Sequence, residues 1–280
     1  MRRVHTAGFA VCLWLAAGLP AHAVLLRYSP TVGKTVKHKV SAAGRTEASV
    51  EGMPEPMRME LGGSIQYTEK ALSETADTVR VETRVTGGKF TMTAAGQSES
   101  QQVPQGKFVA DMDRRGRMVK AIETDLGGKS GALDFMSGGA GSWSSFTNFS
   151  AFPEGDVKAG DIWSDEIKIP AAEGGPEINL TVNSRLLEIA PYQGRNCAKI
   201  HTEFKGPLSF KAPGGEPDSG TMEATLGGKL DWYYDYDSSV YVTGEGSIAI
   251  DMKMAMAGPE MSGVQMTTKM LMNVKLALAQ

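Results

Sequence analysis

The sequence predicts an all-β protein: a curved antiparallel sheet, or a partly closed β-barrel, built from two related halves. Three observations predict it. Apolar and polar residues alternate along most of the chain, as they do in strands that bury one face. Clusters of Gly, Pro, Asn and Asp separate the alternating segments, as turns between hairpin strands require. Helical periodicity is nearly absent, so about a dozen strands are expected.

Residues 1–23 have the composition of a cleavable secretory signal peptide. A basic start is followed by an apolar run, 7–19, that is too short to span a bilayer. Ala21-His22-Ala23 then offers the small residues that signal peptidase requires. We therefore expect a mature chain of one all-β domain, 24–280, that works outside the cytoplasm, in the periplasm or secreted. The alternative is an uncleaved membrane anchor.

Charge and cysteine content argue against several function classes. The chain has Lys+Arg 29 against Asp+Glu 32, a net charge of −3. Proteins that bind nucleic acid or an anionic membrane are usually basic, so this charge argues against both partners. Of the two cysteines, Cys12 lies in the expected signal peptide, so Cys197 would remain alone. No intramolecular disulfide is then expected, and the fold would depend on its core. We expect no nucleic-acid partner and no integral membrane segment.

Two alternating segments illustrate the strand pattern. In residues 78–85 (TVRVETRV) the valines fall on one face and the charged side chains on the other. In residues 196–204 (NCAKIHTEF) the apolar side chains share one face, while Cys197 and His201 fall on the polar face. Both segments are expected to be half-buried antiparallel strands.

Two aspartate-led segments, 113–116 (DRRG) and 235–239 (DYDSS), are predicted to be turns between hairpin strands. The second begins like a calcium-binding loop. However, Val240 stands where that loop needs glycine, and Gly246 where it needs glutamate. Turn formation therefore explains these aspartates better than calcium binding.

The chain resembles itself at an offset of about 120 residues. Three pairs of segments match in the same order: 31–40 with 157–167, 65–90 with 182–210, and 106–119 with 228–242. We predict two related halves, 24–125 and 152–280, joined by a Gly/Ser/aromatic linker, 126–151, with one short helix near 132–136. The alternative is that hairpins resemble one another by chance.

The segment 152–167 (FPEGDVKAGDIWSDEI) is the most distinctive in the chain, with Gly160, Asp161 and Trp163 opening a strand. Together with Ala-Lys-Ile at 198–200 and a Gly-Lys-Leu-x-Trp strand before the second aspartate turn, it resembles a functionally uncharacterised family of exported bacterial β-rich proteins. The resemblance covers most of the mature chain. It implies an extracytoplasmic β scaffold, similar in outline to curved half-barrels that carry lipid or lipoprotein cargo, and it implies no catalytic residues.

Catalytic chemistry has little support in the sequence. Cys197 and His201 share a strand face, but four residues of strand separate their backbones by roughly 13 Å, too far for a nucleophile and its base. His38 lies in an apolar alternation and is expected to be partly buried with its hydrogen bonds satisfied. We therefore expect a protein that is not an enzyme, with no cofactor and no metal site of histidine, cysteine or carboxylate ligands.

Methionine is the one unusually abundant residue, with 16 in the chain. Residues 246–257 and 263–278 are predicted to form a hairpin around Gly258-Pro259, with methionines on its inner face. Three interpretations remain open. The methionines pack a core, they form an adaptable apolar wall for a ligand, or they bind Cu(I), with 53–59 (MPEPMRM) as a second, exposed candidate.

These observations favour an exported, non-enzymatic protein that binds a lipid or other hydrophobic small molecule. The candidate ligand-binding residues are Met252, Met254, Met256, Met266, Met270, Met272, Trp232 and Tyr234. The main alternative is a structural or protein-interaction module of the cell envelope with no small ligand. Cu(I) binding by methionine is the lesser alternative.

Overall fold

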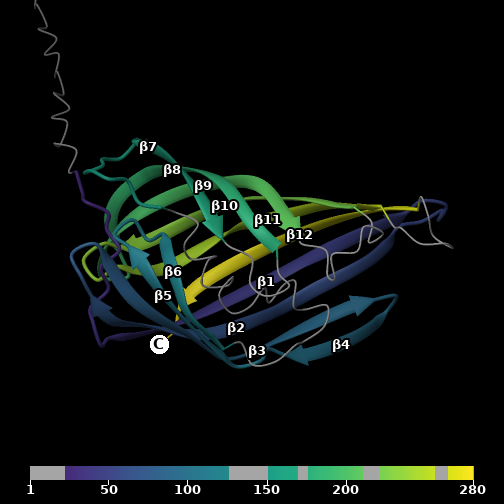
Figure 1. The fold of residues 1–280 in the computed structure, drawn as a ribbon, viewed down its shortest axis with the longest axis horizontal. Helices are drawn as coiled ribbons and strands as arrows, with labels where there is room; N and C mark the ends of the chain where they lie inside the picture. The colour runs from purple at the N-terminus through teal and green to yellow at the C-terminus, as the bar shows by residue number, and fades with distance from the viewer. Residues whose placement is uncertain (1–22, 126–150, 170–175, 211–220, 256–263, 280) are drawn as a thin grey trace, which may run out of the picture.

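The computed structural model describes residues 23–125, 151–169, 176–210, 221–255 and 264–279 (Figure 1). Within these ranges every regular element is a β-strand, which confirms the predicted all-β class. The strands are β1 (Thr35–Val50), β2 (Met57–Glu74), β3 (Thr78–Ala94), β4 (Gln97–Gln102), β5 (Gly106–Asp113), β6 (Met118–Asp125), β7 (Ile162–Ile169), β8 (Pro176–Tyr192), β9 (Arg195–Phe210), β10 (Thr221–Asp235), β11 (Val240–Ala255) and β12 (Gln265–Leu278). The described elements include no helix with the length and apolar character needed to cross a membrane.

All 12 strands belong to one antiparallel sheet, in the order β6-β5-β3-β2-β1-β12-β11-β10-β9-β8-β7, with β4 paired to β3 beside this path. The strands form two meanders that meet where β1 pairs with β12 along their length, from His38 opposite Leu278 to Val50 opposite Met266. The sheet curves strongly, and its outermost strands β6 and β7 do not pair, so it is not closed into a barrel (Figure 1). The predicted curved sheet is confirmed.

The predicted halves correspond to the two meanders, although the duplication itself stays a prediction. The matched segments around 65–90 and 182–210 contain β3 and β9, each third from one edge of the sheet. Residues 126–150 of the predicted linker, including its expected short helix, lie outside the described residues. Ala151 and Phe152, at the end of this region, are both buried.

One face of the sheet carries the hydrophobic core, and we call it the core face. Several of its glycines lie against a large side chain of the next strand. A Cβ on Gly244 would lie 2.2 Å from the ring of Trp232, and a Cβ on Gly228 would lie 2.6 Å from the ring of Phe204. On the opposite face a Cβ on Gly62 would meet nothing within 4 Å. Glycine on the core face therefore leaves room for a large side chain of the neighbouring strand, and this allows the sheet to bend around its core.

Two segments without regular structure, 24–30 and 151–157, cover one end of the core face. Val24 and Val157 exchange two backbone hydrogen bonds of 2.8 and 2.9 Å. The ring of Phe152 is fully buried and lies 4.5 Å, centroid to centroid, from that of Tyr234. We call this end the plug; its buried side chains are Leu26, Tyr28, Phe152, Trp232, Tyr234 and Tyr241.

Both predicted aspartate turns are confirmed. The carboxylate of Asp113 accepts hydrogen bonds from the backbone N–H groups of Arg115 and Arg117, and Gly116 has the expected positive φ, 79°. The carboxylate of Asp235 accepts from the backbone of residues 237 and 238 at 3.1 and 3.2 Å. These hydrogen bonds stabilise the backbone of each turn, so the role of both aspartates is structural.

Candidate functional site

Methionines gather at the end of the core face away from the plug. Residues that lie opposite each other in antiparallel strands point to the same side of the sheet, so the strand register identifies them. We call this set the methionine surface: Met57 and Met59 on β2, Met92 on β3, Met222 on β10, Met252 and Met254 on β11, and Met266, Met270 and Met272 on β12. It extends across six neighbouring strands, from β3 to β10.

The predicted C-terminal hairpin is confirmed in its strands. β11 and β12 pair antiparallel, with Ile248 opposite Met272 and Met254 opposite Met266. The charged residues that alternate with the methionines are exposed on the other face, as expected: Asp251, Lys253, Lys269 and Lys275. The expected turn at Gly258-Pro259 and the candidate Met256 lie outside the described residues.

Burial decreases along the methionine surface toward the turns. Met272 is 3% exposed and belongs to the core, which fits simple packing. Met252, Met254, Met266 and Met270 are only half-buried. Met57 is 49% exposed. Core packing therefore explains Met272, whereas most of the other methionines keep part of their apolar surface accessible.

The middle of the methionine surface is lined by the small residues of β1. Thr46 lies between Met59 of β2 and Met270 of β12, and Ala48 lies opposite Met57. Thr46 and Ala48 are 6% and 5% exposed although the flanking side chains are longer and only partly buried. Long, flexible methionines therefore border a strip of short side chains, and unbranched thioethers adapt their shape to what they contact.

This part of the core face carries no charge along the path from β3 to β9, although Glu99 of β4 lies opposite Met92 at its edge. From β3 to β9 its described positions hold apolar residues or glycine, apart from Thr46 and Thr268. The opposite face of the same strands is charged, with ion pairs such as Arg58–Glu47 at 3.6 Å. An uncharged, half-buried surface beside a charged one is suited to an apolar ligand rather than to an ionic one.

Two of the predicted ligand-binding residues lie elsewhere. Trp232 and Tyr234 belong to the plug and are 3% and 0% exposed. The hydroxyl of Tyr234 donates a 2.5 Å hydrogen bond to the carbonyl oxygen of Arg27. Alternation correctly places these aromatic residues on the same face as the methionines. It does not predict that the aromatic residues lie at one end of that face and the methionines at the other. Sequence reasoning missed Met222 and Met92, and it gave 53–59 only as a separate Cu(I) candidate, because proximity to the hairpin depends on strand order.

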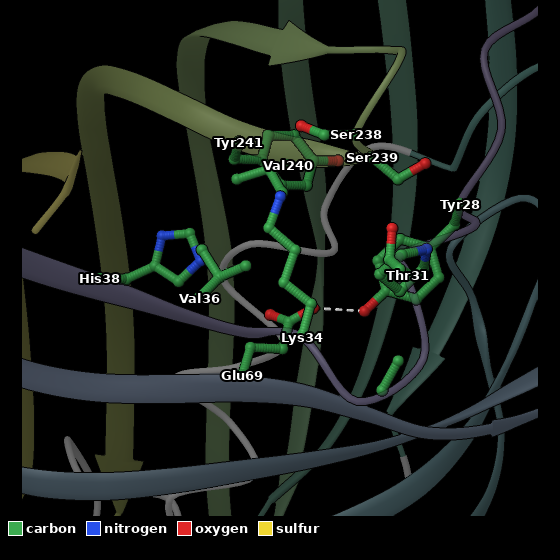
Figure 2. A pocket seen from close by; sticks show the side chains of 12 residues that line it. Tyr28, Thr31, Lys34, Val36, His38, Glu69, Ser238, Ser239, Val240 and Tyr241 are labelled. Carbon is green, nitrogen blue, oxygen red and sulfur yellow. Dashed lines mark hydrogen bonds between the residues drawn. The ribbon is translucent and has the colours of Figure 1, made fainter.

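A small cavity at the plug end is lined by Tyr28, Thr31, Lys34, His38, Glu69 and Ser239, among others (Figure 2). Its volume is about 20 Å³, enough for about one water molecule. The Tyr28 hydroxyl donates a hydrogen bond to the Glu69 carboxylate, drawn as a dashed line in Figure 2, and this contact attaches segment 24–30 to β2. Burial raises the pKa of Glu69. The cavity is too small for a lipid.

His38 is more buried than expected, and its hydrogen bonding is incomplete. The side chain is 4% exposed, and its ring stacks on that of Tyr67 with centroids 5.0 Å apart. Among the described residues its Nδ1 atom has no hydrogen-bond partner, contrary to the expectation of a satisfied residue. Burial lowers the pKa of His38 to about 4, so the ring is neutral at pH 7. His38 is more buried than expected because the strand register places it on β1 between Tyr67 of β2 and Leu278 of β12.

Cys197 and His201 do not form a dyad. Cys197 is 1% exposed, and its thiol donates a long hydrogen bond, 4.0 Å, to the carbonyl oxygen of Tyr192. Cys197 lies on the same face as Lys199 and His201, as expected, but it is buried because the β8–β9 turn and Asp235 cover that end of β9. Burial raises the pKa of the Cys197 thiol to about 11, so it stays protonated. His201 Nδ1 lies 2.6 Å from Asp231, whose hydrogen bond raises the pKa of the imidazole.

The outer face holds a shallow, open depression of about 650 Å³ over β9 to β12 and β1. Its lining mixes charges of both signs, including His201, Lys229, Asp231, Glu245 and Lys275. These side chains alternate with core-face residues along the same strands and largely neutralise one another. Across the described part of the chain, no group of three or more His, Cys, Asp or Glu side chains could hold a metal ion.

Two solved structures are remotely similar to this chain. No family model matches the sequence, and no curated protein matches it. A solved structure concerning lipid–protein interactions in lipovitellin aligns with a TM-score of 0.43 and 11% identity over 90% of this chain. This chain spans 25% of that lipovitellin chain. Pseudomonas aeruginosa OccK7 (OpdD) aligns with a TM-score of 0.23 and 7% identity, over 89% of this chain and 100% of its own. TM-scores this low establish no shared fold, so neither protein's ligand extends to this chain.

Proposed function

We propose that this protein is exported, is not an enzyme, and binds a lipid or other hydrophobic small molecule on the methionine surface. One observation carries the proposal: eight incompletely buried methionines lie together on the core face, where the described positions from β3 to β10 carry no charge. Removing apolar surface from water contributes about 25 cal/mol per Å², so an apolar ligand gains binding energy wherever it covers these side chains.

The adaptability of methionine supports a ligand of loosely defined shape. A thioether chain has several accessible rotamers and a polarisable sulfur, and it repacks against different apolar partners at little cost. The short side chains of Thr46 and Ala48 are buried between the longer methionines of β2 and β12, which cover them. A flexible hydrocarbon chain is a better match for such a surface than a rigid polar molecule.

The burial and hydrogen bonding of the cysteine and histidine side chains support the proposal that this protein is not an enzyme. The Cys197 thiol is buried and protonated, and the neutral ring of His38 is enclosed beside the plug. His201 is engaged by Asp231 on the outer face, away from the methionine surface. None of these three groups is near the proposed ligand.

Export is supported by the basic, apolar and Ala-x-Ala regions of residues 1–23. Cleavage after Ala23 would leave Val24 at the N-terminus, the residue that pairs with Val157 at the plug. N-terminal sequencing of protein recovered outside the cytoplasm should therefore begin at Val24. Recovery of intact Met1 in a membrane fraction would contradict export by cleavage.

Ligand binding is tested with a fluorescent fatty acid and a matched pair of variants. Met252→Glu places a charge on the methionine surface, whereas Lys253→Glu alters charge on the exposed outer face of the same strand. We expect about tenfold weaker binding for Met252→Glu and unchanged binding for Lys253→Glu, because the first must desolvate a carboxylate beneath the ligand. Circular dichroism checks that both variants fold.

Native mass spectrometry of protein purified from its own source gives an independent measurement. A retained hydrophobic molecule, lost in Met252→Glu, is the expected result. Protein that carries no such molecule and binds no fatty acid would favour the structural or protein-interaction module instead.

A further inference from the structure

Three methionines form a straight row across neighbouring strands of the methionine surface. Met222 of β10 lies directly opposite Met254 of β11, and Met254 lies directly opposite Met266 of β12. We propose that these three thioethers form a site for a soft monovalent metal ion, Cu(I) or its redox-inert analogue Ag(I). The proposal rests on this row and is independent of lipid binding.

The register places the three sulfurs within reach of one ion. Directly opposite residues in antiparallel strands have Cβ atoms about 4.5–5.5 Å apart, and their side chains point to the same face. A methionine side chain is long and flexible, so three neighbouring ones can turn their sulfurs toward one another. Met252, two residues before Met254 on the same face, offers a fourth thioether beside the row.

The surroundings select a soft ion over a hard one. Thioether sulfur is a soft ligand that favours Cu(I), whereas Zn²⁺ and Ca²⁺ need imidazole, thiolate or oxygen ligands. The described residues of this part of the core face include no carboxylate, imidazole or thiol. The charged neighbours on these strands, Glu223 and Lys253, alternate with the methionines and so point to the other face.

The burial of the row is also suited to a bound cation. Met222, Met254 and Met266 are all half-buried. An ion can therefore enter from solvent and keep part of its hydration, which limits the desolvation cost of a single positive charge. Fully buried Met272, by comparison, sits in the core, where an incoming ion would have to displace packed side chains.

The test is an anaerobic Cu(I) competition titration of the mature chain against a colorimetric chelator, repeated with Ag(I) alone. We compare the wild type with the triple variant Met222→Leu/Met254→Leu/Met266→Leu. The matched control is Met57→Leu/Met59→Leu/Met92→Leu, which removes three sulfurs from β2 and β3 on the same face. Leucine keeps the volume and the apolar surface of methionine, so both variants should fold.

We expect the wild type and the control to bind one ion per chain, and the row variant to bind at least about tenfold more weakly. X-ray absorption of the Cu(I)-loaded wild type should show sulfur as the nearest scatterer. A wild type that takes no Cu(I) from the chelator, or a row variant that binds as tightly as the control, would overturn the proposal.

Discussion

The guanidinium of Arg115 lies 2.8 Å from the carboxylate of Asp165, and this ion pair joins the two ends of an open sheet. Arg115 belongs to the turn between β5 and β6, and Asp165 belongs to β7 at the other edge. Both side chains are largely buried, 20% and 15% exposed. Arg115 also donates a 2.6 Å hydrogen bond to the carbonyl oxygen of Phe152, so the same guanidinium holds the plug segment.

Loss of this guanidinium should destabilise the fold. Arg115→Met leaves Asp165 without its closest partner in a partly buried place, and we expect a loss of about 1–3 kcal/mol in the free energy of unfolding. The control is Arg58→Met, because Arg58 is 74% exposed and its pair with Glu47 is 3.6 Å long. That change should stay within about 0.5 kcal/mol. Urea unfolding measures both, and equal effects would mean that the edges are held by other contacts.

His38 should make stability depend on pH below neutrality. Its pKa is lowered from 6.5 to about 4 in the folded state, so the unfolded chain binds a proton first as the pH falls. The stability is fully present above pH 6.5 and is lost progressively toward pH 4, by about 3 kcal/mol.

The measurement compares urea unfolding of the wild type and His38→Phe at pH 7.5 and at pH 4. Phenylalanine keeps the ring that stacks on Tyr67 and removes the proton-binding site. Protonation of the nearby Glu69 acts in the opposite direction, because burial raises its pKa, and it is common to both proteins. The wild type should therefore lose about 3 kcal/mol more than the variant. Parallel losses in the two proteins would show that His38 is not responsible.

Local features of the fold could be predicted from the sequence because each depends on neighbouring residues. The alternation in 78–85 placed Val79, Val81 and Val85 on the buried face of β3, where they lie. The Asp113 and Asp235 turns followed from side chains that bond to the backbone two to four residues ahead. Such short-range patterns fix the strands and their faces.

The arrangement of the strands could not be predicted in the same way. β1 pairs with β12 across more than two hundred residues of chain, and no local pattern encodes that pairing. For this reason Met59 and Met222 were not assigned to the surface of the C-terminal hairpin. The burial of Cys197 could not be predicted for a related reason, because the face that alternation marks as polar is covered near the β8–β9 turn.

Two adjacent glycines of β10 should respond differently to alanine. A Cβ on Gly228 would lie 2.5 Å from the carbonyl oxygen of Ser247 and 2.6 Å from the ring of Phe204. A Cβ on Gly227 would come no closer than 3.5 Å to any atom outside its chain neighbours. We expect Gly228→Ala to lose at least about 2 kcal/mol by overpacking, and Gly227→Ala to be neutral or slightly stabilising. Thermal unfolding of both variants is the measurement, and a tolerated Gly228→Ala would mean that these strands can separate.

The methionine surface should show a gradient of stability effects along β11 and β12. Met272 is 3% exposed, so Met272→Ala should cost about 2–5 kcal/mol through lost burial and a cavity. Met254 is half-buried, and Met254→Ala should cost about half as much, since part of its side chain is already in water. Met254→Asp should cost less than Met272→Asp, because a carboxylate at the half-buried position can reach solvent. Met→Leu at either position should stay within about 1.5 kcal/mol.

Urea unfolding of these variants also bears on the proposed ligand. An apolar ligand needs side chains that are accessible before it binds, and such side chains contribute less to the stability of the empty protein. Adding a fatty acid should therefore stabilise the wild type and Met254→Leu, and should stabilise Met254→Ala less, because that variant offers less surface to the ligand. If Met254→Ala instead costs as much as Met272→Ala, this end of the sheet is as tightly packed as its core. The methionine surface would then be closed to a ligand.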